Sequence, residues 1–208
     1  MAWGSLSSDM IYRIPALLIA LTFHEYAHAR MAYAWGDPTA KLAGRLTLNP
    51  IAHLDPIGLL MLWIARFGWA KPVPINPYNF TDQRKGLFWV SLAGIGMNLI
   101  IGFVAACLMV IFRYQGSFLL VIIQNLLVYN VYLAVFNIIP LPPLDGSKIL
   151  LSILPPESRA WFYKIEPYGP FILIALLILG VISLIILPFA NAIINLFFRL
   201  ASLLTFKQ

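Results

Sequence analysis

Long apolar runs separated by short polar connections dominate this sequence. Three of them cover residues 87–112, 118–137 and 171–187, and a fourth, at residues 10–35, is apolar except near its middle. A helix needs about 20 mainly apolar residues to cross the hydrocarbon core of a bilayer. Only 11% of the 208 residues are charged, against about 25% in ordinary soluble domains. The chain is therefore predicted to cross a membrane several times as helices.

We expect a single membrane-embedded domain, residues 1–208, of the all-α polytopic class. It would contain about six transmembrane or re-entrant helices: residues 10–35, 56–67, 87–112, 118–137, 171–187 and the stretch after Pro188. The run at 56–67 is too short to cross alone, so it either re-enters or forms a tilted half-span. A short helix is expected from Ser147, and the proline-rich residues 155–170 are expected to form a loop.

Prolines also shape the connection between the first two long runs. Pro72, Pro74 and Pro77 forbid a helix there and favour an extended path. Residues 45–48, with the sequence RLTL, could form a short strand. We therefore predict a short extended or β-hairpin segment at the membrane surface.

Lysine and arginine residues predict the orientation in the membrane. Residues 36–86 hold six of them and residues 138–170 hold three, whereas the connection 113–117 holds only Arg113. Cytoplasmic loops are enriched in these residues, so the first two regions should face the cytoplasm. A multi-pass protein of the cell membrane would then have its N-terminus outside and its C-terminus inside. The net charge of +6 fits contact with the lipid bilayer, and no basic cluster indicates a nucleic-acid partner.

Two histidines and a glutamate interrupt the first apolar run, in the sequence HEYAH at residues 24–28. Ionisable residues inside a membrane are costly and usually functional. On a helix, His24 and His28 differ by about 40° and ~6 Å of rise, so both rings can reach one metal ion. Glu25 lies about 100° further round, where it could act as a general base on a metal-activated water. The spacing therefore predicts a catalytic zinc site.

A catalytic zinc needs a third protein ligand and an open position. Acidic residues are few, and Asp145 follows the proline-broken end of the run 118–137 in the sequence PLPPLDG. The lysine and arginine pattern predicts that Asp145 and the end of the first helix lie on the same side of the membrane. On these residues alone, two alternatives stay open: histidines satisfied by neighbouring helices, and a proton relay.

Three separated motifs resemble the site-2 protease family of intramembrane zinc metalloproteases. They are HEYAH, the AG-x-x-x-N pattern at residues 93–98, and the N-x-x-P-x-x-P-L-D-G pattern at residues 137–146. The likeness is to the compact prokaryotic type without a PDZ or CBS domain. It implies that Zn²⁺ is bound by His24, His28 and Asp145 while Glu25 activates water. It also implies that Asn98 and Asn137 lie near the substrate, although Ile95 stands where the family often has proline.

The resemblance implies hydrolysis of a peptide bond within or next to a transmembrane helix of a membrane-protein substrate. Residues 45–48 and 73–76 are possible strand edges for the unwound substrate. Two other functions stay open: a catalytically inactive relative that binds membrane proteins, and a metal or proton transporter. His53 could be a partner of a metal ligand, a substrate contact or a turn residue, and the surrounding turn formers favour the last. The substrate and the oligomeric state are not indicated.

Overall fold

The computed structural model describes residues 10–58, 70–112 and 118–205. Residues 56–58 are helical, and the rest of the helix predicted at 56–67 lies outside the described residues. The elements in chain order are α1 (Met10–Ala34), α2 (Thr39–Leu42), η1 (Pro50–His53), η2 (Pro77–Asn79), α4 (Gln83–Ile111), α5 (Phe118–Asn137), α6 (Asp145–Ile153), α7 (Pro156–Ile165), η3 (Glu166–Tyr168), α8 (Gly169–Ile178) and α9 (Val181–Thr205).

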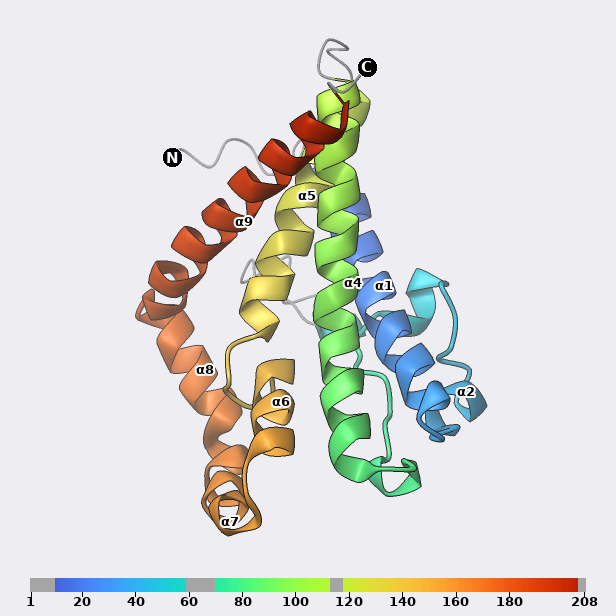
Figure 1. The fold of residues 1–208 in the computed structure, drawn as a ribbon, viewed down its shortest axis with the longest axis vertical. Helices are drawn as coiled ribbons and strands as arrows, with labels where there is room; N and C mark the ends of the chain where they lie inside the picture. Colours follow the sequence, from blue (N-terminus) through green and yellow to red (C-terminus); the bar gives the residue numbers. More distant parts are fainter. Residues whose placement is uncertain (1–9, 59–69, 113–117, 206–208) are drawn as a thin grey trace.

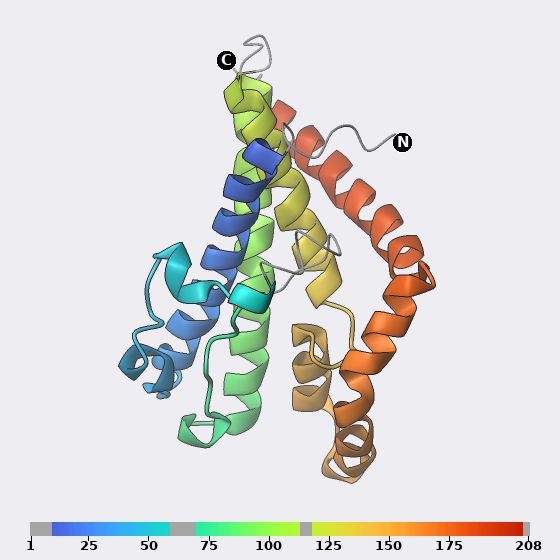
Figure 2. The same ribbon diagram turned by 180° about the vertical axis from the view of Figure 1, so that it is seen from behind.

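Helix α4 is the central element of the bundle. It packs against α1, α5, α6 and α9, and α1 also packs against α5 (Figure 1). Helices α1 and α5 run in one direction along the long axis while α4 runs in the other, as the view from behind shows (Figure 2). Apolar residues of α4, α5, α8 and α9 form the main core, which includes Ala105, Leu127, Val131 and Ile182. The predicted all-α class is confirmed for the described residues.

Four helical segments are long and apolar enough to cross a membrane: Gln83–Ile111, Phe118–Asn137, Glu157–Ile178 and Val181–Leu204. The predicted number of about six is therefore not supported by the described residues. Helix α1 has 25 residues, enough for a crossing, and its bounds agree with the prediction for 10–35. It is not among the four, because Arg13, His24, Glu25, His28 and Arg30 lower its hydropathy.

The prediction of a loop at residues 155–170 is wrong. Helix α7 begins at Pro156 and continues through η3 into α8. Proline is accepted in the first turn of a helix, where its missing N–H has no partner to lose. Pro156 and Pro170 each lie in such a first turn. The prolines of this region therefore mark where helices begin, and they do not exclude helix.

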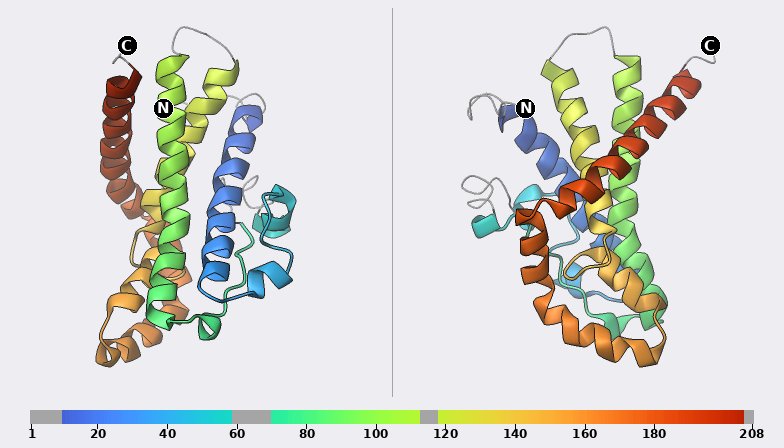
Figure 3. Two further views of the ribbon diagram at one scale, coloured as in Figure 1. Left: turned by 45° about the vertical axis from the view of Figure 1, so that its right-hand side comes forward. Right: turned by 90° about the vertical axis from the view of Figure 1, so that its left-hand side faces the viewer.

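The chain bends between α8 and α9 without reversing its direction. The break is at Gly180, which has a φ of +73°, a value that glycine adopts readily. Pro188, in contrast, lies inside α9 and does not end it. Helices α8 and α9 together lead from one end of the bundle to the other, so the start of α1 and the end of α9 lie at the same end (Figure 3). The expected orientation, with the N-terminus outside and the C-terminus inside, stays a prediction.

The predicted β-hairpin does not form among the described residues. Their only β-type pairing is an isolated antiparallel bridge between Leu54 and Ala70, next to a hydrogen bond from Lys71 N–H to the His53 carbonyl. Residues 45–48 and 73–76 stay unpaired with each other. The segment 70–79 instead runs past α1 and is attached to it through side chains, because its prolines remove the N–H groups that a ladder needs.

Asp37 makes one of these attachments. Its carboxylate is buried and accepts hydrogen bonds from the N–H and hydroxyl of Thr39, from Asn76 N–H at 2.8 Å and from the Asn79 amide at 2.8 Å. Burial alone would raise the pKa of the Asp37 carboxyl, but the bonds from Thr39, Asn79 and Asn76 outweigh burial and lower the pKa below its ordinary value. Asp37 therefore joins the turn after α1 to η2.

Replacing Asp37 with asparagine is expected to lower Tm by about 5–15 °C near neutral pH, because bonds to a buried carboxylate are lost at a cost of about 2–4 kcal/mol. A lowered folded pKa stabilises the protein above the unfolded pKa of about 3.9, and this stabilisation is lost as pH falls through the folded pKa. The Tm difference between wild type and variant should therefore shrink below about pH 4. Thermal unfolding followed across pH measures it.

The matched control is Asp55→Asn. Asp55 caps residues 57 and 58 through Oδ1, an acceptor that asparagine keeps, so Tm should change little. Equal losses in Tm for the two variants would contradict the stabilising role assigned to the Asp37 carboxylate.

Candidate metal centre

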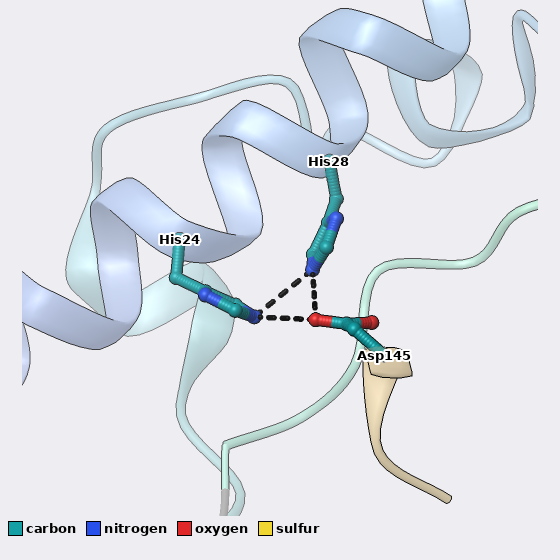
Figure 4. A group of neighbouring side chains, drawn as sticks. All are labelled: His24, His28 and Asp145. Carbon is teal, nitrogen blue, oxygen red and sulfur yellow. Dashed lines mark hydrogen bonds and ion pairs between the residues drawn. The ribbon is translucent and has the colours of Figure 1, made fainter. Parts of the chain in front are cut away.

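Three side chains that are far apart in the sequence converge at one buried point. His24 Nε2 and His28 Nε2 are 2.9 Å apart, and Asp145 Oδ2 lies 3.1 Å from the first and 3.0 Å from the second (Figure 4). All three side chains are buried. The His24, His28 and Asp145 positions predicted from the motifs are thus brought together, with α1 supplying two side chains and α6 the third.

Helix α4 approaches the two histidines closely at Gly94. A Cβ atom on this residue would lie 2.5 Å from His28 Nε2 and 2.6 Å from His24 Cε1. Any larger residue would fill the space that the imidazole rings occupy. Gly94 therefore lets α4 pack directly against the face of α1 that carries His24 and His28.

The turn between α5 and α6 places Asp145. Gly146 packs against the main chain of Ile138 and Ile139 so closely that a side chain there would collide with it. At the other end of α6, the Arg84 guanidinium of α4 donates to the carbonyls of Ser152 at 3.0 Å and Ile153 at 3.1 Å. A cation at these last carbonyls stabilises the C-terminal end of the helix. Both contacts fix α6, and with it Asp145, against α4.

The hydrogen bonds of the two rings determine which nitrogen atoms carry hydrogen. His28 Nδ1 is 2.7 Å from the Val90 carbonyl, which can only accept, so this nitrogen donates. His24 Nδ1 is 2.6 Å from Asn98 Oδ1, and it donates to this oxygen. In neutral histidines both Nε2 atoms then carry a lone pair, and these lone pairs converge on an Asp145 oxygen.

Three acceptor atoms at such distances repel one another unless a metal ion or a proton lies between them. Tetrahedral zinc with ligands at about 2.0–2.2 Å holds them about 3.4 Å apart, and the observed separations of 2.9–3.1 Å are close to this value. Two imidazoles and one carboxylate are also a ligand set that zinc uses in catalytic sites. His24, His28 and Asp145 therefore fit a zinc ion by donor type, burial and geometry.

Glu25 is buried beside His24 and contacts the extended segment 70–76. The main-chain N–H of Val73 donates to Glu25 Oε2 at 2.8 Å. This segment is also held where the Arg45 guanidinium donates to the Lys71 carbonyl at 2.5 Å. The predicted general base is thus in place next to a metal ligand, with one carboxylate oxygen oriented by the backbone.

The structure places the remaining predicted residues as follows. Asn98 is fully buried; its Oδ1 accepts from His24, and its amide donates to the Ala20 carbonyl and to Asn130 Oδ1. In this conformation it has no hydrogen left for a substrate. Asn137 is partly buried and donates to the Leu133 carbonyl of its own helix. His53 donates from Nε2 to the Thr47 carbonyl at 2.8 Å, as a turn residue would.

Sequence reasoning missed three groups that contact the site. They are the Val90 carbonyl, the Val73 N–H and the Asn130 side chain. The first two are backbone groups, and no residue type reveals them. Asn130 had a signal, since it is an amide inside the apolar run 118–137. Buried amides in such helices usually find partners on neighbouring helices.

An open apolar groove with a volume of about 530 Å³ runs between α1 and α4. Tyr26, Arg30, Trp89 and Met97 are among its lining residues, whereas His24, Glu25, His28 and Asp145 are not. The groove therefore lies on a face of α1 different from the one that carries the metal ligands.

Three similar proteins each carry the name putative zinc metalloprotease. The chain is 40% identical over 193 residues to YwhC of Bacillus subtilis, covering 89% of this chain and 88% of YwhC. It is 32% identical to Rip2 of Mycobacterium tuberculosis over 80% of this chain and 65% of Rip2. It is 31% identical to MJ0611 of Methanocaldococcus jannaschii over 62% of this chain and 63% of that protein. No family model and no solved structure matches the chain.

Fold and site together define a helical protein of membrane type with a buried His-His-Asp cluster that could hold a metal ion. The chain belongs to the zinc metalloprotease family that YwhC and Rip2 represent. It spans nearly all of YwhC but slightly less than two thirds of Rip2.

Proposed function

We propose that this protein is an intramembrane zinc metalloprotease of the site-2 type, which hydrolyses a peptide bond within or next to a transmembrane helix of another membrane protein. The observation that carries the proposal is the convergence of His24, His28 and Asp145 beside Glu25. These ligands lie in a bundle whose other long helices can cross a membrane. Ligands that meet at one point favour a metal centre over a proton relay, which needs groups spaced along a path.

The residues of the chain divide the chemistry between them. When bound, zinc supplies Lewis-acid activation of water and of the scissile carbonyl. Glu25 takes the proton of the attacking water and passes it to the departing amine. We assign this proton to Oε1, because Oε2 already accepts the Val73 N–H. The intact Glu25 argues against the alternative of an inactive relative.

A substrate helix hides its peptide bonds, so we expect it to unwind before cleavage. The segment 71–76 offers few donors for pairing with an unwound chain. Pro72 and Pro74 have no N–H, and the N–H groups of Lys71, Val73 and Asn76 donate to His53, Glu25 and Asp37. Asn137, at the end of α5, has a side chain bonded only to its own helix among the described residues. Asn137 is therefore our proposed substrate contact, in preference to Asn98.

We further propose that the site opens toward the cytoplasmic side of the cell membrane. Helices α2, α6 and α7 and the start of α4 lie at the end of the bundle opposite to the start of α1 (Figure 1). These elements carry a set of basic residues: Lys41, Arg84, Lys85, Lys148, Arg159 and Lys164. Basic residues at one end of a membrane bundle favour the cytoplasmic side. Substrate identity and oligomeric state stay outside the proposal.

The purified protein in detergent is expected to contain one zinc ion per chain and to cleave a peptide that forms a transmembrane helix. Removing the metal with a chelator should abolish cleavage, and added zinc should restore it. Asp145→Ala should lose the metal, since it removes one of three protein ligands. Elemental analysis of the protein measures its zinc content, and mass spectrometry of the peptide measures cleavage.

Glu166→Ala is the matched control, because Glu166 is an exposed acid in η3. It should keep both the metal and the activity. Full zinc content in Asp145→Ala would remove this residue from the ligand set, and metal-independent cleavage would overturn the proposed mechanism.

A further inference from the structure

A continuous row of three buried side chains connects α1, α4 and α5. His24 Nδ1 is 2.6 Å from Asn98 Oδ1, and Asn98 Nδ2 is 2.8 Å from Asn130 Oδ1. Asn98 and Asn130 have no exposed surface, and His24 is 6% exposed. Asn130 Nδ2 also donates to the Leu126 carbonyl of its own helix at 2.8 Å. The row therefore begins at a backbone group of α5 and ends at the imidazole ring of a predicted metal ligand.

Two backbone carbonyls, one bonded to Asn130 and one bonded to Asn98, determine the direction of every bond in the row. The Leu126 carbonyl accepts only, so the Asn130 amide nitrogen faces it and Asn130 Oδ1 faces Asn98. The Ala20 carbonyl likewise accepts from Asn98 Nδ2 at 3.1 Å, which leaves Asn98 Oδ1 facing His24. His24 Nδ1 must then carry hydrogen, and its Nε2 keeps a lone pair. No member of the row can reverse without losing a buried hydrogen bond.

We propose that Asn130 is a positioning residue for the metal centre: acting through Asn98, it fixes the tautomer and the ring orientation of His24, so that Nε2 points at the metal position. The inference rests on the zinc site of the proposed function, and it assigns a role to two asparagines. Partners that hold the non-ligating nitrogen of a histidine typically change metal affinity by about 10–100-fold when removed. Asn130 does not touch the metal position itself.

A simpler role for the two asparagines is adhesion between helices, since buried amides hold membrane helices together. The two roles differ in what they predict for His24. If the asparagines only hold the helices together, replacing them lowers the stability of the bundle and leaves the tautomer of the His24 ring unchanged in the folded protein. Positioning requires that the folded variant shows a changed population of His24 tautomers and weaker zinc binding.

Helix α5 offers a matched pair of variants to separate these roles. Asn125 donates to the Val121 carbonyl at 2.7 Å, as Asn130 does to Leu126, but it makes no bond to Asn98. Replacing either residue with leucine removes the same kind of bond within α5. Asn130→Leu is expected to raise the Kd for zinc about tenfold, and Asn98→Leu at least as much. Asn125→Leu should leave the Kd unchanged.

The second measurement needs no metal. The chain has three histidines, so ¹⁵N-histidine labelling of the protein with a histidine-free affinity tag gives few ring signals. NMR of the metal-free protein reports which ring nitrogen atoms carry hydrogen. Wild type and Asn125→Leu should show His24 with hydrogen on Nδ1 throughout, whether or not Nε2 has also taken up a proton. Asn130→Leu should add a population with hydrogen on Nε2 alone.

If Asn98→Leu does not fold, the comparison of Asn130→Leu with Asn125→Leu still tests the proposal, because both replacements lie on α5 and leave Asn98 unchanged. The proposal is overturned if Asn130→Leu matches Asn125→Leu in both zinc Kd and His24 tautomer. If the wild type binds no zinc, the proposed function fails, and the tautomer comparison alone still decides whether Asn130 orients His24.

Discussion

Glu25→Gln is expected to reduce peptide hydrolysis by about 10²–10⁴-fold and to leave zinc binding intact, because general base catalysis contributes a factor of this size. Glutamine has nearly the same shape as glutamate, and its carbonyl oxygen can still accept the Val73 N–H. An amide cannot take up the proton of the attacking water. The loss should therefore fall on kcat, with zinc content and Tm close to those of wild type.

The measurement combines a cleavage assay on a transmembrane peptide with elemental analysis of the same sample. Glu157→Gln is the control, since Glu157 lies in the first turn of α7, away from the metal ligands, and should keep full activity. Wild-type rates in Glu25→Gln would exclude Glu25 as the base. A variant that loses zinc together with activity would instead assign Glu25 to the metal centre as a structural group.

Gly94→Ala is expected to weaken zinc binding by about 100-fold without unfolding the protein, since disturbing the groups that orient metal ligands costs about 10–100-fold in metal affinity. The new Cβ would lie 2.5 Å from His28 Nε2 and 2.6 Å from His24 Cε1, which real contacts do not permit. The imidazole rings can rotate away, whereas the packed backbones of α1 and α4 cannot separate easily. The added methyl group would therefore displace the ligands and preserve the bundle.

Gly96→Ala is a close control on the same helix. A Cβ at Gly96 would have no atom within 4 Å, so zinc affinity and activity should stay unchanged. Alanine is also more favourable than glycine in a helix by about 1 kcal/mol, so the Tm of Gly96→Ala should not fall. Titration with zinc against a chromophoric chelator and thermal unfolding compare the two variants. Equal zinc affinities would show that α4 does not constrain the histidines.

The convergence of His24, His28 and Asp145 could be predicted because the signals of these residues are local. His24 and His28 share one helical face through a spacing of four, and Asp145 follows a proline-rich helix end. The bounds of α1 and α5 were also predictable, since each ends at a strong helix-breaking signal, Gly36-Asp37-Pro38 and the proline-rich residues 140–143. Patterns of this kind depend on neighbours in the chain and need no knowledge of tertiary packing.

The hydrogen bonds around the site could not be predicted in this way. His24 and Asn98 are 74 residues apart, and the bonds at Val90 and Val73 use backbone groups that every residue except proline provides. The course of the last helices was mispredicted for a different reason. Pro188 was expected to end a helix, but it lies within α9, and the break occurs at Gly180. Both glycine and proline can interrupt a helix, and packing decides which one does.

The bond between Val73 and Glu25 has a consequence for how the site tolerates change. Its donor belongs to the main chain, so the identity of side chain 73 is irrelevant to the bond, and nineteen of the twenty amino acids could supply the hydrogen. Proline is the exception, and prolines occupy both adjacent positions, Pro72 and Pro74. The stiff extended segment is thus without proline at the one position, between Pro72 and Pro74, where proline would leave the Glu25 carboxylate without its backbone partner.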